Sequence, residues 1–127
     1  MKIWIFNHYA NIPNYPGGTR HFDLARYLVS KGHQVTIFAS SYHYLLLKEL
    51  KIYPNTFYLE ENINGINFVW IKTHPYKKND LKRLLNMLSY AINTYRIRND
   101  FDKSDIIIGS TVHPFAAYSA SLIAKKN

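Results

Sequence analysis

The chain of 127 residues lacks cysteine altogether, so it has no disulfide bond and no thiolate nucleophile. Glycine and proline are sparse, with five residues each, and the chain contains no low-complexity segment or internal repeat. No apolar run approaches the length of a transmembrane helix, and the run from Ile3 to Phe6 is too short for the core of a signal peptide. These absences together predict a cytoplasmic protein.

Acidic residues are scarce as well, because 8 Asp and Glu residues stand against 16 Lys and Arg residues and leave a formal net charge of +8. Such an excess indicates anionic partners: nucleotide phosphates, anionic lipid head groups or nucleic acid. A basic surface that serves only solubility is the alternative. Hydrophobic residues make up 47% of the chain, which is enough for the core of one domain.

The most informative segment lies between a predicted strand at Lys2–Phe6 and a predicted helix at Arg20–Lys31. The loop between them ends in Gly17-Gly18, followed by Thr19 as the expected helix N-cap. Glycines let the backbone approach a ligand closely, and the free N–H groups at a helix N-terminus favour negative charge. We therefore expect a phosphate-bearing ligand at the end of the first strand.

The rest of the chain alternates strand and helix patterns. The further elements expected are strands at Gln34–Ala39, Thr56–Leu59, Asn67–Ile71 and Asp105–Gly109, and helices at Asp80–Ile97 and Pro114–Ala124. Asn64-Gly65 predicts a hairpin turn between two of these strands, and Tyr44–Leu50 predicts one or two helical turns. The fold class is therefore α/β, a Rossmann-like open, mostly parallel sheet with helices on both faces. Because such a sheet normally continues, we expect residues 1–127 to be a partial domain of a longer protein.

Residues from two distant loops are expected to meet at one edge of this sheet. With the strand order 3-2-1-4, the first and fourth strands are neighbours, and ligands bind beyond their carboxyl ends. The Gly17-Gly18 loop should therefore face His113, which follows the last strand. His113 is predicted to contact a ligand, and capping of the following helix is the alternative. Ser110 and Thr111, in the same loop as His113, are expected to line the site.

Further candidates lie around the first loop. Arg20 and His21 fall in the first turn of the first predicted helix, where cations oppose the helix dipole unless an anion lies over it. We favour ligand contact for Arg20 over exposure to solvent, whereas packing of His21 against the sheet is an equal alternative. His8 and Tyr9 are candidates for lining the site. No metal site is expected, because the histidines lack metal-ligand spacing.

Several fingerprints of nucleotide-binding enzymes are absent from the sequence. The first loop contains no G-x-G-x-x-G pattern, and Ser40-Ser41 stands where an acidic ribose ligand would end the second strand. Both gaps argue against a dinucleotide-dependent oxidoreductase. The chain also has no P-loop pattern, and its residue pattern gives no basis for a Ser-His-Asp triad.

Six stretches of the sequence together carry a family resemblance. They are Asn7-His8-Tyr9, Pro16–Phe22, Leu24-Ala25, Gly32–Ser40, Asp105–Ser110 and His113-Pro114-Phe115. These stretches resemble the amino-terminal part of GT4-type glycosyltransferases, which are retaining enzymes of the GT-B fold. The bacterial enzymes that build surface polysaccharides, such as capsule and O-antigen, are the most similar branch. The resemblance extends over nearly the whole chain.

This resemblance implies a two-domain enzyme. The acceptor binds mainly to the amino-terminal domain, which this chain would represent, and the donor binds mainly to a carboxyl-terminal domain that this chain lacks. Gly17 and Gly18, with Thr19 and Arg20 beside them, would close over the diphosphate of a nucleoside-diphosphate sugar, in particular a UDP-sugar. His113 would be the catalytic residue near the transferring sugar. The resemblance implies neither a metal nor another cofactor, and an isolated first domain would be inactive.

The helix predicted at Asp80–Ile97 bears on the acceptor. Its leucine face is expected to pack on the sheet, whereas the basic cluster of Lys77, Lys78, Lys82 and Arg83 suits either the inner face of the cytoplasmic membrane or a solvated edge. The resemblance implies a lipid-linked or glycan acceptor, and no nucleic acid. A non-catalytic basic module that binds nucleic acid or another anionic partner is the second hypothesis.

Overall fold

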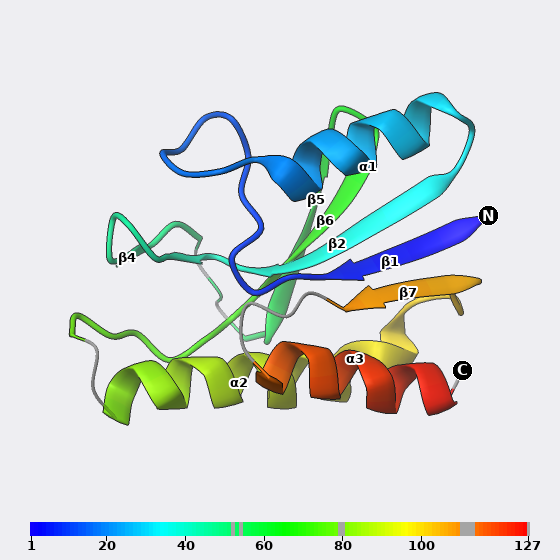
Figure 1. The fold of residues 1–127 in the computed structure, drawn as a ribbon. Coiled ribbons are helices and arrows are strands. Elements are labelled where there is room, and N and C mark those ends of the chain that lie inside the picture. Colours follow the sequence, from blue (N-terminus) through cyan, green and yellow to red (C-terminus); the bar gives the residue numbers. More distant parts are fainter. Residues whose placement is uncertain (52, 54, 79–80, 110–113, 127) are drawn as a thin grey trace.

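A computed structural model describes residues 1–51, 53, 55–78, 81–109 and 114–126 of the chain (Figure 1). Its elements, in chain order, are β1 (Lys2–Phe6), α1 (Arg20–Ser30), β2 (Gln34–Ser40), β3 (Tyr42–His43), β4 (Lys48–Glu49), β5 (Tyr58–Ile63), β6 (Ile66–Ile71), α2 (Leu81–Ile97), the 3₁₀ helix η1 (Arg98–Asp100), β7 (Ile106–Gly109) and α3 (Pro114–Lys126). The predicted strands and helices are present, except that the strand expected at Thr56–Leu59 lies further along the chain at Tyr58–Ile63 and that the helical turns expected over Tyr44–Leu50 are absent from the described residues.

The main sheet has five strands in the order β5-β6-β2-β1-β7. Strands β6, β2, β1 and β7 are parallel, and β5 is an antiparallel edge strand joined to β6 by the predicted hairpin. Taken in chain order, the parallel strands follow the expected order 3-2-1-4. Helix α1 covers one face of the sheet, and α2 and α3 lie side by side on the other (Figure 1). The predicted α/β fold class, with helices on both faces, is confirmed.

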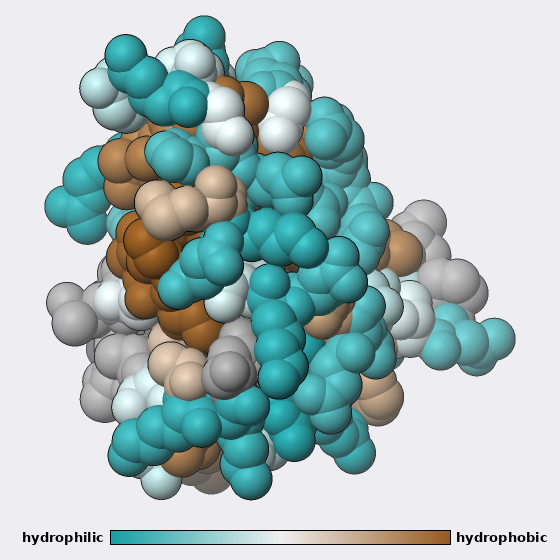
Figure 2. Space-filling model, turned by 90° about the vertical axis from the view of Figure 1, so that its right-hand side faces the viewer, coloured by the Kyte–Doolittle hydropathy of each residue, from teal (hydrophilic) through white to brown (hydrophobic). Residues whose placement is uncertain are grey.

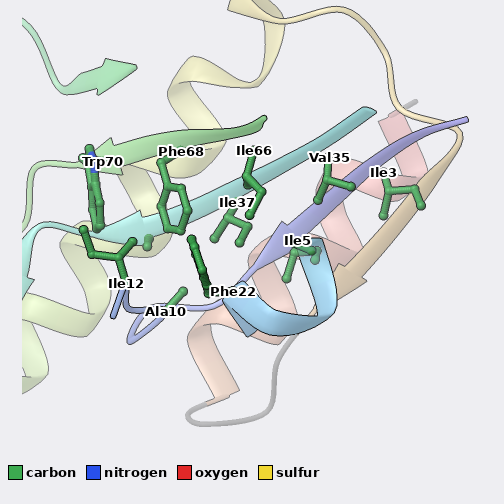
Figure 3. Packing of buried hydrophobic residues seen from close by; sticks show 12 residues of the cluster. Ile3, Ile5, Ala10, Ile12, Phe22, Val35, Ile37, Ile66, Phe68 and Trp70 are labelled. Carbon is green, nitrogen blue, oxygen red and sulfur yellow. The ribbon is translucent and has the colours of Figure 1, made fainter. Parts of the chain in front are cut away.

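One core cluster lies between α1 and the sheet. Phe22 and Ala25 are fully buried on the inner side of α1, and the ring of Phe22 lies 6.2 Å from that of Phe68. Ile12, from the loop after β1, closes the same cluster (Figure 3). Gly32 has a φ of +90°, a conformation that glycine adopts easily, and it ends the helix as predicted.

A second cluster lies between the opposite face of the sheet and the helices α2 and α3. Phe6 and Phe38 stack with ring centroids 4.5 Å apart, and Trp4 meets Phe38 edge-on at 5.2 Å. Tyr90 of α2 and Ile123 of α3 are fully buried against these rings. The hydroxyl of Tyr90 donates a hydrogen bond of 2.6 Å to the carbonyl of Phe38, so α2 is anchored to the backbone of β2.

The prediction of helical turns over Tyr44–Leu50 is wrong, because this stretch forms the small β3–β4 hairpin. The side chain of His43 organises its turn: the backbone N–H groups of Leu45 and Leu46 both donate to His43 Nδ1 at 3.2 Å. Leu47 then adopts a φ of 51°, which a right-handed helix does not allow. Hydrogen bonds to the side chain of the preceding histidine thus determine the turn conformation of the three leucines.

The orientation predicted for α2 is also wrong. The leucine face was expected to pack on the sheet, yet Leu81, Leu84 and Ile92 are 69%, 40% and 56% exposed. The buried side instead carries the polar residues Asn86 and Asn93. Both asparagines donate to backbone carbonyls beyond the end of β6, those of His74 and Lys72, and so supply partners that the sheet does not provide there. The need of these backbone carbonyls for hydrogen-bond donors therefore explains why the asparagine face of α2, and not the leucine face, is turned toward the sheet.

At the amino ends of the strands, the surface that faces the viewer in Figure 2 is mainly hydrophilic, with one hydrophobic area. A hollow of about 370 Å³ on this part of the molecule is lined mostly by polar residues, including Lys2, Thr36 and Asn67. Lys2 also pairs with Asp102 at 2.9 Å. None of the helices in the described ranges has the length and apolar character needed to cross a bilayer.

Candidate functional site

The candidate site lies along the carboxyl ends of the parallel strands. Phe6, the last residue of β1, is paired with Phe38 of β2 on one side and with Gly109 of β7 on the other. The loop after β1, the β3–β4 hairpin and the segment between β6 and α2 all leave the sheet on this side (Figure 1). This is the edge at which open α/β sheets bind ligands, because the winding direction reverses between β1 and β7.

The loop after β1 is held in shape by its own side chains. Asn11 is 4% exposed, and its Nδ2 donates to the carbonyl of Pro16 at 2.8 Å. Gly17 follows with a φ of +112°, and a Cβ added there would lie 2.5 Å from the hydroxyl oxygen of Tyr44. The backbone conformation therefore favours glycine at this position, and a side chain would in addition have to displace the Tyr44 hydroxyl.

Gly18 differs from Gly17 in every one of these respects. Its φ lies outside the region that favours glycine, and a Cβ added there would meet no atom within 4 Å, although both glycines are exposed. Folding alone does not explain why this position carries glycine. The space beside Gly18 leaves room for a ligand to approach the backbone closely.

The start of α1 is built differently from the expectation. Thr19 precedes the helix, but its hydroxyl donates to Asp23 Oδ2 at 3.1 Å and makes no side-chain cap within the described helix. Asp23 already places a negative charge in the first turn, where it favours the helix dipole. Arg20 is exposed beside it. The amino-terminal end of α1 thus carries one cation next to the glycines, Arg20, and one carboxylate three residues further along the helix, Asp23.

His8 and Tyr9 form part of an aromatic stack that crosses the edge of the sheet. His8 is 1% exposed and lies between the rings of Tyr9 and Tyr90, with centroid distances of 4.5 and 4.7 Å. Tyr9 then meets Tyr44 at 5.2 Å. His8 therefore packs beneath the candidate site and is not exposed in it. The half-buried Tyr9 and Tyr44 form the wall of the site.

His21 belongs to the structural support of the site. Its Nδ1 accepts a hydrogen bond of 2.7 Å from Asn7 Nδ2, which ties α1 to the end of β1. Burial, and to a smaller degree the charge of Arg20, lowers the pKa of His21 below its ordinary value of 6.5. The imidazole is consequently neutral at pH 7 and adds no positive charge for an anionic ligand.

The sequence analysis missed a buried polar network beneath this edge. Ser40 Oγ and Thr73 Oγ1 lie 2.7 Å apart, and Asn86 Nδ2 donates to Thr73 Oγ1 at 2.9 Å and to the carbonyl of His74 at 2.7 Å. The network joins the ends of β2 and β6 to α2. A signal for it existed in the polar residues that directly follow two apolar strands, but nothing in the sequence paired them with Asn86.

A small cavity opens next to this network. Its volume is about 10 Å³, and its walls include Tyr9, Tyr44 and Trp70. Trp70 Nε1 is buried and finds no hydrogen-bond partner among the described residues. His43 lines the same cavity, and burial is the main cause that lowers its pKa, against a smaller raising effect of the Pro16 carbonyl. The space suits a single water or a hydroxyl group.

Three predicted site residues cannot be compared with the structure, because Ser110, Thr111 and His113 lie outside the described residues. The preceding residue, Gly109, is paired with Phe6 at the same edge as the glycine loop. Of the other candidates, Gly17 and Tyr9 both lie against Tyr44, a residue that the sequence analysis did not select, whereas His21 and His8 pack inward. Comparisons of the chain with protein-family profiles, with curated proteins and with solved structures found no match.

Proposed function

We propose that this chain is the acceptor-side domain of a retaining glycosyltransferase. The reaction would move a sugar from a nucleoside-diphosphate sugar, in particular a UDP-sugar, to a lipid-linked or glycan acceptor in the synthesis of a cell-surface polysaccharide. In this proposal residues 1–127 are one part of a two-domain enzyme, inactive on their own and dependent on no metal or other cofactor. His113 would contact the transferring sugar.

The observation that carries the proposal is the contrast between the two glycines of the first loop. Gly17 is explained by its backbone conformation and by Tyr44, whereas Gly18 has no such explanation. An exposed glycine beside a helix N-terminus, at the end of a central parallel strand, is the arrangement by which backbone N–H groups hold phosphate. Arg20, exposed next to it, would add a positive charge toward the diphosphate.

Peripheral contact with the inner face of the cytoplasmic membrane is part of the proposal. It is supported by the outward orientation of the apolar residues of α2, among them Leu81, Leu84 and Leu85. Basic residues lie next to them, and neither α2 nor α3 contains an acidic residue. Apolar side chains flanked by cations favour the surface of an anionic membrane.

The second hypothesis is a non-catalytic basic module for nucleic acid. Its support is the net charge of +8. The exposed leucines of α2 speak against it, since nucleic-acid surfaces are polar and charged. An affinity for random oligonucleotides that falls steeply with salt would favour this hypothesis over glycosyl transfer.

Calorimetric titration with UDP-sugars tests the proposal. We expect weak binding by the chain, lost in Gly18→Val, where the side chain fills the space beside the backbone, and reduced in Arg20→Ala. Arg26→Ala is the matched control, because it removes the same charge from an exposed position of the same helix. Equal affinities for the chain and the Gly18→Val variant would refute the proposed role of the glycine loop.

A further inference from the structure

A second pocket lies at the same edge of the sheet, between the start of β3 and the segment that leads from β6 into α2. Its volume is about 400 Å³. The residues that line it are Tyr42, Pro75, Tyr76, Lys77, Lys78 and Lys82. Tyr42 also lines the small cavity next to Tyr9 and Tyr44, so the pocket and the candidate site share a wall. A ligand bound here would lie next to the place proposed for sugar transfer.

The inner wall of this pocket is aromatic and firmly held. Tyr42 and Tyr76 are 5% and 7% exposed, and their ring centroids lie 5.2 Å apart. The hydroxyl of Tyr42 donates a hydrogen bond to the carbonyl of Tyr76. Burial is the main cause that raises the pKa of the Tyr76 phenol above its ordinary value of 10.0. The wall of the pocket is mostly apolar.

The mouth of the pocket is basic. Lys77 and Lys78 are exposed, and neither forms an ion pair with a described residue. Lys82 lies in the first turn of α2, which contains no acidic residue. Asp80, the one acidic residue in this stretch of the sequence, lies outside the described residues. Cations gathered at a helix N-terminus oppose the helix dipole, and an anion placed among them relieves that repulsion.

Exposed apolar residues continue outward from the pocket along α2. Leu85 lies one helical turn beyond Lys82, and Leu81 and Leu84 are exposed on the same half of the helix. A ligand with an anionic head and an apolar tail would match this order of surfaces. The head would meet the lysines, and the tail would run over the aromatic wall and the leucines.

We propose that this pocket binds the phosphate or diphosphate group of an amphiphilic ligand, with Lys77, Lys78 and Lys82 around the charged head. The inference deepens the proposed function, on which it rests for the reaction, by assigning a position to a phosphate-linked acceptor. The binding step itself is independent of the glycine loop. A soluble phosphate ester and the head group of a membrane lipid share this chemistry, and experiment separates them.

Farnesyl diphosphate, inorganic pyrophosphate and farnesol are the probes for this pocket. We expect the chain to bind farnesyl diphosphate more tightly than pyrophosphate, which lacks the apolar part, and farnesol weakly. The triple variant Lys77→Ala, Lys78→Ala, Lys82→Ala should weaken binding of farnesyl diphosphate by about tenfold or more. The matched control, Lys103→Ala, Lys125→Ala, Lys126→Ala, removes the same charge elsewhere and should change the affinity by less than about twofold.

Two outcomes would overturn the inference. Equal weakening in both triple variants would mean that the net charge alone attracts the ligand. Binding to vesicles that contain phosphatidylglycerol, without binding of monomeric farnesyl diphosphate, would mean that a membrane surface is recognised instead of a single head group. Failure with UDP-sugars at the glycine loop would contradict the proposed function but would leave these results unaffected, since the two sets of variants share no residue.

Discussion

At the scale of single residues, the two adjacent glycines of the first loop have different reasons to be there. The positive φ of Gly17 and its contact with Tyr44 both explain why glycine occupies that position. Neither reason applies to Gly18. From the sequence, Gly17 and Gly18 were predicted to bind an anion together. Their different roles were not predictable, because the contact that distinguishes Gly17 is made by Tyr44, which lies in the β3–β4 hairpin. Only the folded loop shows which glycine is structural.

Substitution by alanine should therefore lower the stability of the fold at Gly17 and leave it nearly unchanged at Gly18. Gly17→Ala is expected to lower the free energy of unfolding by about 1–3 kcal/mol, because the residue is strained and its Cβ displaces the Tyr44 hydroxyl. Gly18→Ala should change the free energy of unfolding by no more than about 0.5 kcal/mol. Urea denaturation measures both values.

The Tyr44→Phe background provides the control for this comparison. Removal of the hydroxyl takes away the close contact but leaves the backbone strain, so Gly17→Ala should cost less there than in the parent chain. If Gly17→Ala proves as harmless as Gly18→Ala, the described conformation of the loop is wrong.

The histidines of the site give the stability of the fold a pH dependence. Burial lowers the pKa of His21 and that of His43, so the unfolded chain binds more protons than the folded chain just below pH 6.5. The free energy of unfolding should accordingly be fully retained at pH 7 and should decrease as the pH falls. His21→Gln, which keeps a neutral partner for Asn7, should reduce this slope without abolishing it, because His43 still titrates.

Urea denaturation between pH 7 and pH 5 supplies the test. An identical slope in the parent chain and in His21→Gln would exclude His21 as a buried neutral group.

At the scale of elements, α2 shows what a sequence pattern cannot reveal. Its 3.6-residue periodicity predicted a helix over Asp80–Ile97, and the structure has a helix over Leu81–Ile97. The assumption that leucines face the core was wrong, because a carbonyl of β2 and carbonyls beyond the end of β6 take donors from Tyr90, Asn86 and Asn93. Those carbonyls belong to segments distant in sequence, so periodicity alone carries no information about them.

A pair of alanine substitutions in α2 tests this orientation. Asn86→Ala removes the donor for the buried Thr73 Oγ1 and for the carbonyl of His74, and we expect it to lower the free energy of unfolding by about 1–3 kcal/mol. Leu84→Ala, at a position that is 40% exposed, should cost less than about 1 kcal/mol. A larger loss for Leu84→Ala than for Asn86→Ala would contradict the inward side assigned to α2.

At the scale of the whole molecule, the strand order proved the most predictable feature. The apolar run Ile3–Phe6 is typical of a central parallel strand, and the doubly wound fold expected from the alternating strands and helices has the order 3-2-1-4 that the parallel strands show. From that order followed the edge where ligands bind. The lysine pocket beside Tyr42 and Tyr76 was not predictable, since it depends on how the β3–β4 hairpin meets the start of α2.

In the whole molecule, the two proposed binding regions are neighbours. The glycine loop and the lysine pocket lie at the same edge, separated by the wall of Tyr9, Tyr42 and Tyr44. A donor diphosphate at one and a phosphate-bearing acceptor at the other would bring two anionic ligands toward a shared centre. The net charge of +8 suits a surface that must hold both.

The most direct test of the proposed glycosyltransferase function is a map of UDP-sugar binding on the chain by backbone amide chemical shifts. We expect the shifts to concentrate on Gly17, Gly18 and Arg20, to vanish in Gly18→Val and to persist in Arg26→Ala. Shifts spread over the basic surface without this focus, or no shifts along the carboxyl edge at millimolar UDP-sugar, would contradict the assignment of this edge as the donor-facing side of a glycosyltransferase.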